Sequence, residues 1–163
     1  MYHTSIFSQL GDSALLEDDT DLSGKKDSLP QSFVPGRNIL FLTIAAAHCY
    51  KHNIGNLWCG VNQTDYSGYP DCRKETIFHL ERALQNGMDT HINLKTPLMY
   101  LSKAQIFLLA KDVGILPMVV DWSHTCYNGD HETKHDWGYG CAACPACLLR
   151  KKGWEEAWRR EKQ

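Results

Sequence analysis

The stretch Cys141-Ala-Ala-Cys144-Pro-Ala-Cys147 carries the strongest chemical signal of the chain, because a thiol recurs there at every third position. A fourth cysteine, Cys126, lies upstream in Thr125-Cys-Tyr-Asn-Gly129. Thiolates two residues apart can converge on one cation, and four of them match tetrahedral zinc with bonds of about 2.3 Å. An iron–sulfur cluster also takes four thiolates and is the alternative. Because four thiolates leave no coordination position open, we expect a structural zinc whose ligands are Cys126, Cys141, Cys144 and Cys147.

Other histidines and cysteines are weaker candidates for chemistry. Three histidines, at positions 124, 131 and 135, could compete as metal ligands, but we expect exposed polar residues in the loop over 127–140. Cys49 and Cys59 lie in apolar segments and are expected to be core thiols. Cys72 lies in a polar loop beside Arg73, where a cation can lower a thiol pKa, so a nucleophilic role is the less favoured alternative.

Outward from the cysteines, helical and strand-like patterns alternate along the chain. Ser102 and Gln105 have the spacing of a capping box, and Ile77, Leu80 and Leu84 share one helical face. We expect Asn38 to cap a helix that is apolar all round and therefore buried between layers. The expected helices cover residues 38–52, 74–87, about 102–113 and 144 onward, and the expected strands cover 56–61, 91–94 and 115–120.

This alternation predicts an α/β layered fold with parallel strands. We divide the chain into a mobile N-terminal segment over residues 1–32, an α/β nucleotide or substrate domain over 33–122, and a zinc-binding loop with the C-terminal helix over 123–163. The first segment is rich in Asp, Ser, Gly and Lys, with scattered apolar residues.

Composition limits the classes of function. The 163 residues are 43% hydrophobic and carry a net charge of -2, which does not favour electrostatic capture of a nucleic-acid backbone. The longest apolar run, Ile39–Ala47, is far shorter than a membrane-spanning helix, and the N-terminus has no signal-peptide pattern. We therefore expect a cytoplasmic protein, in which the seven cysteines are metal ligands or buried thiols rather than disulfides.

Two segments have the chemistry of a nucleotide-like site. Arg37 and Asn38 stand at the start of a predicted helix, where free N–H groups and the helix dipole favour an anion; the alternative is an ordinary capped helix with a solvent-facing arginine. In the segment over 65–73, tyrosines can flank a planar ring, carboxylates can accept from its N–H edges, and Arg73 can hold a carboxylate or phosphate. Lys103, near another helix start, is a weaker candidate for phosphate. The candidate ring-binding residues are Asp65, Tyr66, Tyr69, Asp71 and Arg73.

Four motifs occur in an order that resembles the 7-cyano-7-deazaguanine synthase family of queuosine biosynthesis. They are Ser32-Phe-Val-Pro-Gly-Arg-Asn-Ile-Leu-Phe-Leu42, Gly60-Val-Asn-Gln-Thr-Asp-Tyr-Ser-Gly-Tyr-Pro-Asp-Cys-Arg73, Lys95-Thr-Pro-Leu-Met99, and Thr125-Cys-Tyr-Asn-Gly129 with the later cysteines.

The resemblance implies a Rossmann-like ATP-pyrophosphatase fold with a parallel sheet and a structural zinc. It implies an ATP-dependent C–N ligase, with Mg²⁺ accompanying ATP, that converts 7-carboxy-7-deazaguanine and ammonia to the nitrile preQ0. Carried over, Arg37 and Lys103 are candidates for the ATP phosphates and Asn38 for orienting the helix start. The four cysteines become the zinc ligands, and the ring-binding residues above become candidates for the deazaguanine pocket.

The resemblance has one departure. The family begins with a strand and a Ser-Gly-Gly-x-Asp-Ser phosphate loop, which this sequence lacks. We therefore expect an α/β sheet truncated at its N-terminus, which needs a separate N-terminal polypeptide for activity and can also form a homodimer. The alternative is a catalytically inactive, zinc-stabilised fragment or partner-binding subunit. Nucleic-acid binding through the basic C-terminal tail is a remote third possibility.

Overall fold

The computed structural model describes residues 25–26, 29–30, 32–63 and 68–160. The chain divides into two compact units, residues 1–100 and 101–163. Of the segment predicted as mobile, the described part includes a short antiparallel pair formed by β1 (Lys25–Lys26) and β2 (Leu29–Pro30). No helix among the described residues is both long enough and apolar enough to cross a membrane.

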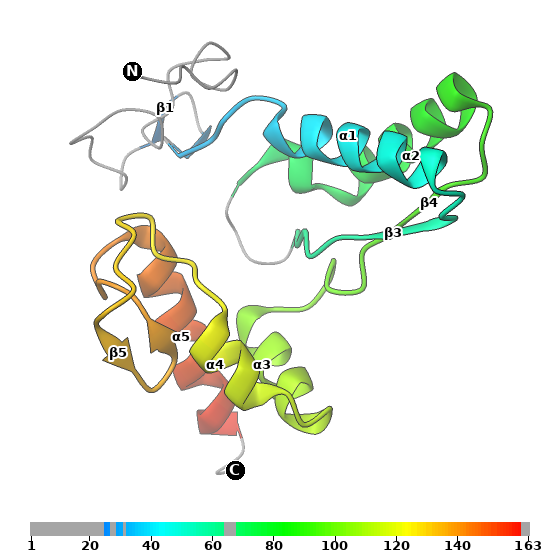
Figure 1. Cartoon of the computed structure of the whole chain (residues 1–163). Coiled ribbons are helices and arrows are strands. Elements are labelled where there is room, and N and C mark those ends of the chain that lie inside the picture. The colour runs from blue at the N-terminus through cyan, green and yellow to red at the C-terminus, as the bar shows by residue number, and fades with distance from the viewer. Residues whose placement is uncertain (1–24, 27–28, 31, 64–67, 161–163) are drawn as a thin grey trace. The chain divides into compact units, whose positions relative to one another are not determined.

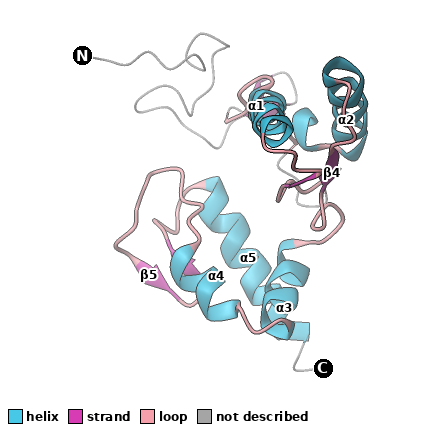
Figure 2. Cartoon of the chain, turned by 45° about the vertical axis from the view of Figure 1, so that its right-hand side comes forward, coloured by secondary structure: helices cyan, strands magenta, loops and turns pink. Residues whose placement is uncertain are grey.

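The N-terminal unit is built on a parallel pair of strands. β3 (Asn56–Trp58) pairs with β4 (Asn93–Lys95) so that Leu57 lies opposite Leu94. Helices α1 (Arg37–Lys51) and α2 (Lys74–Met88) both lie on one side of this pair, as Figures 1 and 2 show. Side chains alternate across a strand, so the leucines face the helices and Trp58, which is 66% exposed, belongs to the opposite face. The expected parallel α/β arrangement is therefore confirmed for this unit.

The core of the N-terminal unit is aliphatic. In α1 the buried residues are spaced by about one helical turn, at Leu42, Ala46 and Cys49, and in α2 Ile77 and Leu84 occupy one face. They pack with residues from β4 and the segments flanking it, and the complete cluster is Leu42, Ala46, Cys49, Ile77, Leu84, Ile92, Leu94 and Met99.

Two expectations for α1 are wrong. The helix is not buried all round, because Phe41 is 51% exposed and Ile44 is 60% exposed among the described residues. Asn38 is also not its cap: the N-cap residue is Gly36, whose φ of 70° lies in the left-handed region that glycine adopts without strain. Asn38 instead lies inside the first turn.

The described part of the C-terminal unit, residues 101–160, contains three helices and a hairpin. Helix α3 (Lys103–Asp112) packs against α5 (Pro145–Arg160), with α4 (Leu116–Trp122) and the β5–β6 hairpin (Lys134–His135 and Gly138–Tyr139) beside them (Figure 2). The expected capping box at the start of α3 is confirmed, since Ser102 Oγ accepts from the Gln105 amide and Gln105 accepts from the Ser102 amide.

The expected strand over residues 115–120 is wrong, because this run forms α4. Pro117 sits in the first turn of that helix, where its missing N–H costs nothing and its fixed φ suits the helix. The packing of α3 against α5 also groups residues 101–122 with the cysteine-rich part, whereas the predicted domain boundary placed them with the α/β part.

Candidate functional site

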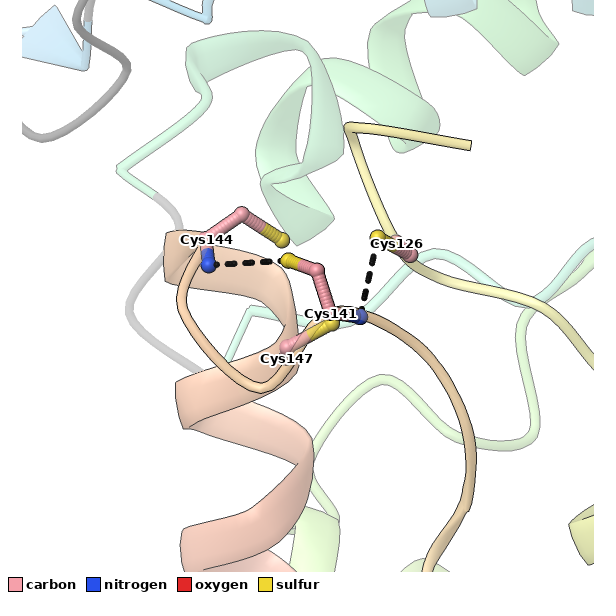
Figure 3. Close-up of side chains that lie close together, drawn as sticks. All are labelled: Cys126, Cys141, Cys144 and Cys147. Carbon is pink, nitrogen blue, oxygen red and sulfur yellow. Dashed lines mark hydrogen bonds between the residues drawn. The ribbon is translucent and has the colours of Figure 1, made fainter. Parts of the chain in front are cut away.

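The four cysteines of the predicted cluster meet in the C-terminal unit. Cys126 follows α4, Cys141 follows the hairpin, Cys144 precedes α5, and Cys147 lies in the first turn of α5. Their sulfur atoms all lie within 4.8 Å of one another, and their side chains converge in Figure 3. Three of the four residues are buried, and Cys141 is half-buried. The arrangement can hold one metal ion.

Backbone amides surround these sulfur atoms. The Cys144 amide donates to Cys141 Sγ at 3.3 Å, and the Cys141 amide donates to Cys126 Sγ at 3.5 Å, both drawn in Figure 3. The Tyr127 amide donates to Cys144 Sγ at 3.4 Å. Gly140, with φ at 156°, is required by space, because a Cβ there would lie 2.6 Å from Cys147 Sγ. Such N–H donors and the start of α5 favour thiolates over thiols.

The thiols of the cluster affect each other's protonation. Burial acts to raise the pKa of Cys126, but hydrogen bonds, first from the backbone of Cys141, lower it to about 6. Burial, and then a hydrogen bond with Cys144, raise the pKa of Cys147 well above its ordinary value. Four thiols this close cannot all ionise without a cation between them. A metal centre among the sulfur atoms would supply the positive charge that this donor set needs.

The histidines near the cluster lie outside this group of four. His124 and His135 are half-buried rather than exposed, and one ring nitrogen of each lies 2.9 Å from a backbone carbonyl oxygen. His131 is exposed, as expected, and its ring stacks on that of His124. The ligand group among the described residues is therefore made of cysteines alone.

In the N-terminal unit, the structure joins the two segments that the sequence singled out. The Asn38 amide donates to Asp71 Oδ2 at 3.0 Å, and Asn38 Nδ2 donates to Cys72 Sγ at 3.2 Å. Asp71 is only 4% exposed, in the short 3₁₀ helix η2 (Pro70–Cys72). A carboxylate from the second segment thus occupies the positive end of α1, beside Arg37, the first residue of that helix.

A second contact ties the same segments together. Ser32 is buried, and its hydroxyl lies 2.6 Å from the Tyr69 hydroxyl. The rings of Phe33 and Tyr69 lie 5.7 Å apart. Of the predicted site residues, Asn38, Tyr69 and Asp71 thus take part in contacts between the two segments, while Asp65 and Tyr66 lie outside the described residues.

A shallow cavity of about 420 Å³ lies beside these segments in the same unit. Of the predicted residues, only Arg73 lines it, together with aromatic side chains that the sequence reasoning missed. Phe78 is 47% exposed and Tyr100 is 64% exposed, and nothing in the periodicity of their segments marks them as functional. The lining residues are Gln63, Arg73, Lys74, Glu75, Phe78 and Tyr100.

The remaining candidates are resolved differently. Cys49 is buried in the core as expected, and Cys59 is half-buried against it. Burial, followed by the nearby Asp71 carboxylate, raises the pKa of Cys72 to about 11, so this residue is a neutral thiol at pH 7 and not an activated nucleophile. Lys103 begins α3 and belongs to the C-terminal unit, whereas Arg37 belongs to the N-terminal unit.

Together, the fold and the cluster define an α/β protein with four cysteines placed so that they can hold a metal ion. The chain belongs to the family described as "Queuosine biosynthesis protein QueC", whose model matches residues 1–158. The resemblance found from the motifs is thereby confirmed.

Curated relatives with the name 7-cyano-7-deazaguanine synthase agree. The relative from Wolinella succinogenes is 52% identical over 155 residues, covering 93% of this chain and 66% of the relative. Those from Bordetella pertussis and a Bradyrhizobium species are 48% and 55% identical over 92% and 80% of this chain, and 62% and 56% of their own lengths. The chain therefore spans about three fifths of the length of the relatives it matches.

Proposed function

We propose that the chain takes part in the ATP-dependent conversion of 7-carboxy-7-deazaguanine and ammonia to 7-cyano-7-deazaguanine. The observation that carries this proposal is the match to the family over nearly the whole chain, including both segments that meet at the start of α1. The names of the relatives supply the product. A role in queuosine biosynthesis follows from the family, whereas the reaction of this chain is our inference.

The metal we propose is zinc, held by Cys126, Cys141, Cys144 and Cys147. An all-thiolate set of four suits tetrahedral zinc and leaves no position for a substrate, so its role is structural. Cys126 follows α4, Cys141 follows the hairpin, and the other two ligands lie at the start of α5. Zinc would therefore hold these three elements together. Its binding free energy would then contribute to folding.

On the nucleotide side, we propose Arg37 and Lys103 for the phosphates of ATP and Asn38 for orienting the start of α1. Asn38 already uses its amide and its side chain to hold Asp71 and Cys72. Asp71 therefore fits a positioning role at this helix start, and Arg37 is left to supply the positive charge. ATP, with Mg²⁺, converts the substrate carboxylate oxygen into a leaving group, and cationic side chains stabilise the charge that develops on phosphate.

For the deazaguanine pocket, we propose Asp65, Tyr66, Tyr69, Asp71 and Arg73. The cavity beside Arg73 supports the assignment of Arg73, because Phe78 and Tyr100 expose aromatic surface there that can pack on a planar ring. The guanidinium of Arg73 can bind the substrate carboxylate with two parallel hydrogen bonds. In this role Arg73 would favour a carboxylated heterocycle over the same ring without the carboxylate.

The test is turnover by the zinc-loaded chain, measured as nitrile formation by mass spectrometry. The chain is supplied with the carboxy compound, ATP, Mg²⁺ and ammonium, alone and with a polypeptide covering the remaining part of the Wolinella succinogenes relative. We expect nitrile in at least the supplemented reaction. In Arg73→Gln the rate of nitrile formation should fall by about 100-fold or more, which is on the order of the loss of one or two charge-assisted hydrogen bonds.

Arg159→Gln, which removes an exposed arginine of the C-terminal unit, is the matched control and should react like the unmodified chain. Absence of nitrile from both preparations under full zinc loading would contradict the proposed reaction.

A partner-binding subunit without catalysis is the second candidate. The specific observation in its favour is apolar exposure in the N-terminal unit, where Phe41 and Ile44 of α1 and Trp58 of β3 are more than half exposed. We propose the supplementing polypeptide as the occupant of the exposed face of α1 formed by Phe41 and Ile44; a second copy of the chain is the other outcome. Tight association with that polypeptide without nitrile formation would favour this candidate over the enzyme.

A further inference from the structure

Arg150 is a buried cation without a carboxylate partner among the described residues. It is 4% exposed, although it lies on α5 in a stretch rich in basic residues. Its guanidinium donates to neutral groups only: Nε to Trp137 O at 2.7 Å, Nη1 to Ser123 O at 3.2 Å and Ser123 Oγ at 3.0 Å, and Nη2 to Val119 O at 2.9 Å. Arginine is almost never buried without an opposite charge, so its neighbourhood requires an explanation.

The hydrogen bonds of Arg150 reach both segments that lead into the cysteine cluster. Ser123, at the end of α4, precedes Cys126 by three residues, and Trp137, in the hairpin, precedes Cys141 by four. Arg150 itself follows Cys147 by three residues, about one turn of α5. One side chain thus connects the three parts of the chain that supply ligands.

The space around the guanidinium is closed by close packing. A Cβ at Gly138 would lie 2.6 Å from Arg150 Nη2 and 2.8 Å from Val120 O, and the φ of Gly138 is 119°. The ring of Phe107 also faces the guanidinium, with its centroid 5.9 Å from the guanidinium carbon. The hairpin therefore approaches the arginine as closely as a glycine allows.

The cysteine cluster is a source of negative charge close to Arg150 along α5, because Cys147 precedes it by about one helical turn. Burial lowers the pKa of Arg150, so a negative charge nearby is needed to stabilise its charged form. Four thiolates around a divalent ion carry a formal charge of about −2. A dianion buried in a small unit needs cationic or hydrogen-bonding partners, as an arginine needs an anionic one.

We propose that Arg150 is a positioning residue that supplies the counter-charge of the metal-bound cysteine cluster and holds the segments that deliver Cys126 and Cys141 to it. The inference rests on the proposed metal and is independent of the proposed reaction. It predicts that metal affinity depends on this side chain although Arg150 cannot itself bind a metal.

The experiment is a zinc titration of the full chain in competition with a chromogenic chelator. Arg150→Met should weaken zinc binding by about 10–100-fold, the range for residues that support metal ligands. Arg150→Lys keeps the charge but cannot donate to all of these carbonyl oxygens, and it should lie in between. Lys152→Met, which removes an exposed cation of the same helix, is the control and should bind zinc like the unmodified chain.

A second background separates charge from packing. Cys141→His gives a three-thiolate cluster with one histidine, a ligand set known for zinc, whose formal charge is about −1. The fold-loss caused by Arg150→Met should then be smaller than in the four-cysteine chain. A role in packing alone predicts the same fold-loss in both backgrounds.

Equal zinc affinity in the unmodified chain and in both Arg150 variants would overturn the inference and leave the proposed metal intact. Equal losses in the two backgrounds would overturn its electrostatic part. Failure of the unmodified chain to bind zinc would overturn both the metal and the inference. If Arg150→Met does not fold, Arg150→Gln in the two backgrounds gives the same comparison, because glutamine removes the charge while keeping a hydrogen-bond donor.

Discussion

The two units of the chain are stabilised in different ways. The N-terminal unit buries an aliphatic core between two helices and a parallel strand pair. The C-terminal unit has a smaller apolar cluster around Ala104, Phe107 and Ala157, and it also buries Cys126, Cys144 and Cys147 with Trp137 and a buried arginine. Apolar packing is available as soon as the chain collapses, whereas a cluster of thiols becomes stabilising only with a cation at its centre. We therefore expect metal removal to destabilise the C-terminal unit and truncation of the aliphatic core to destabilise the N-terminal unit.

Metal removal should have the largest effect, confined to the C-terminal unit. Structural zinc sites in small domains contribute about 10–16 kcal/mol of binding free energy, which is as large as the stability of a whole domain. We expect chelation or Cys147→Ser to unfold this unit at 25 °C. Tryptophan fluorescence reports it directly, because Trp122, Trp137, Trp154 and Trp158 are four of the five tryptophans of the chain.

Hydrogen exchange provides the comparison with the other unit. Amides of α1 and α2 should keep their protection after chelation while amides of α5 lose it. Cys59→Ser, at a half-buried cysteine outside the cluster, should leave both the metal content and the fluorescence unchanged. An unchanged tryptophan spectrum after complete metal removal would refute the proposed structural role.

Truncation of the aliphatic core is the reciprocal experiment. Ile77 is 1% exposed, so Ile77→Ala should destabilise the N-terminal unit by about 2–5 kcal/mol through lost burial and the cavity left behind. Urea unfolding, monitored by hydrogen exchange at the amides of α1 and α2, measures this loss of stability. The tryptophan transition of the C-terminal unit should keep its midpoint.

Ile44→Ala is the matched control, because it deletes the same atoms from a side chain that is 60% exposed. Its effect on stability should be within about 0.5 kcal/mol. The same variant separates packing within the chain from partner binding, since it should weaken association if the exposed face of α1 binds a partner. Equal destabilisation by Ile44→Ala and Ile77→Ala would contradict the exposed position of Ile44 on α1.

Features set by residues close together in the sequence were predicted correctly. The capping box at Ser102, the amphipathic α2 and the cysteine spacing each involve residues a few positions apart. The strand predicted over residues 115–120 was wrong because the apolar residues there, two of them adjacent valines, fit a strand by composition. Pro117 already indicated the start of a helix. Short apolar runs do not distinguish strand from helix by periodicity.

Features that depend on distant residues could not be predicted. The partner of the Asn38 amide is Asp71, 33 residues away, so a local rule named the wrong cap. Arg150 looked like one of several basic residues on a helix, and only the structure shows that it is buried and bound to α4 and the hairpin. The metal ligands were predictable because three of the four lie within seven positions, whereas the residue that supports them was not.

The smallest predicted effect tests the polar link in the N-terminal unit. Asp71→Ala removes the acceptor of the Asn38 amide and the negative charge at the positive end of α1, which should cost about 0.5–2 kcal/mol, the range for a lost helix cap. Asp71→Asn keeps an oxygen acceptor without the charge, so its smaller cost isolates the dipole contribution of about 0.3–1 kcal/mol. Urea unfolding gives the cost, and hydrogen exchange at the Asn38 amide locates it. If the two variants are equally destabilised, the charge of Asp71 contributes more than its hydrogen bond. Asp71 then acts in the N-terminal unit as Arg150 is proposed to act in the C-terminal unit. Each is a buried charge whose partner lies far away in the sequence or in another element.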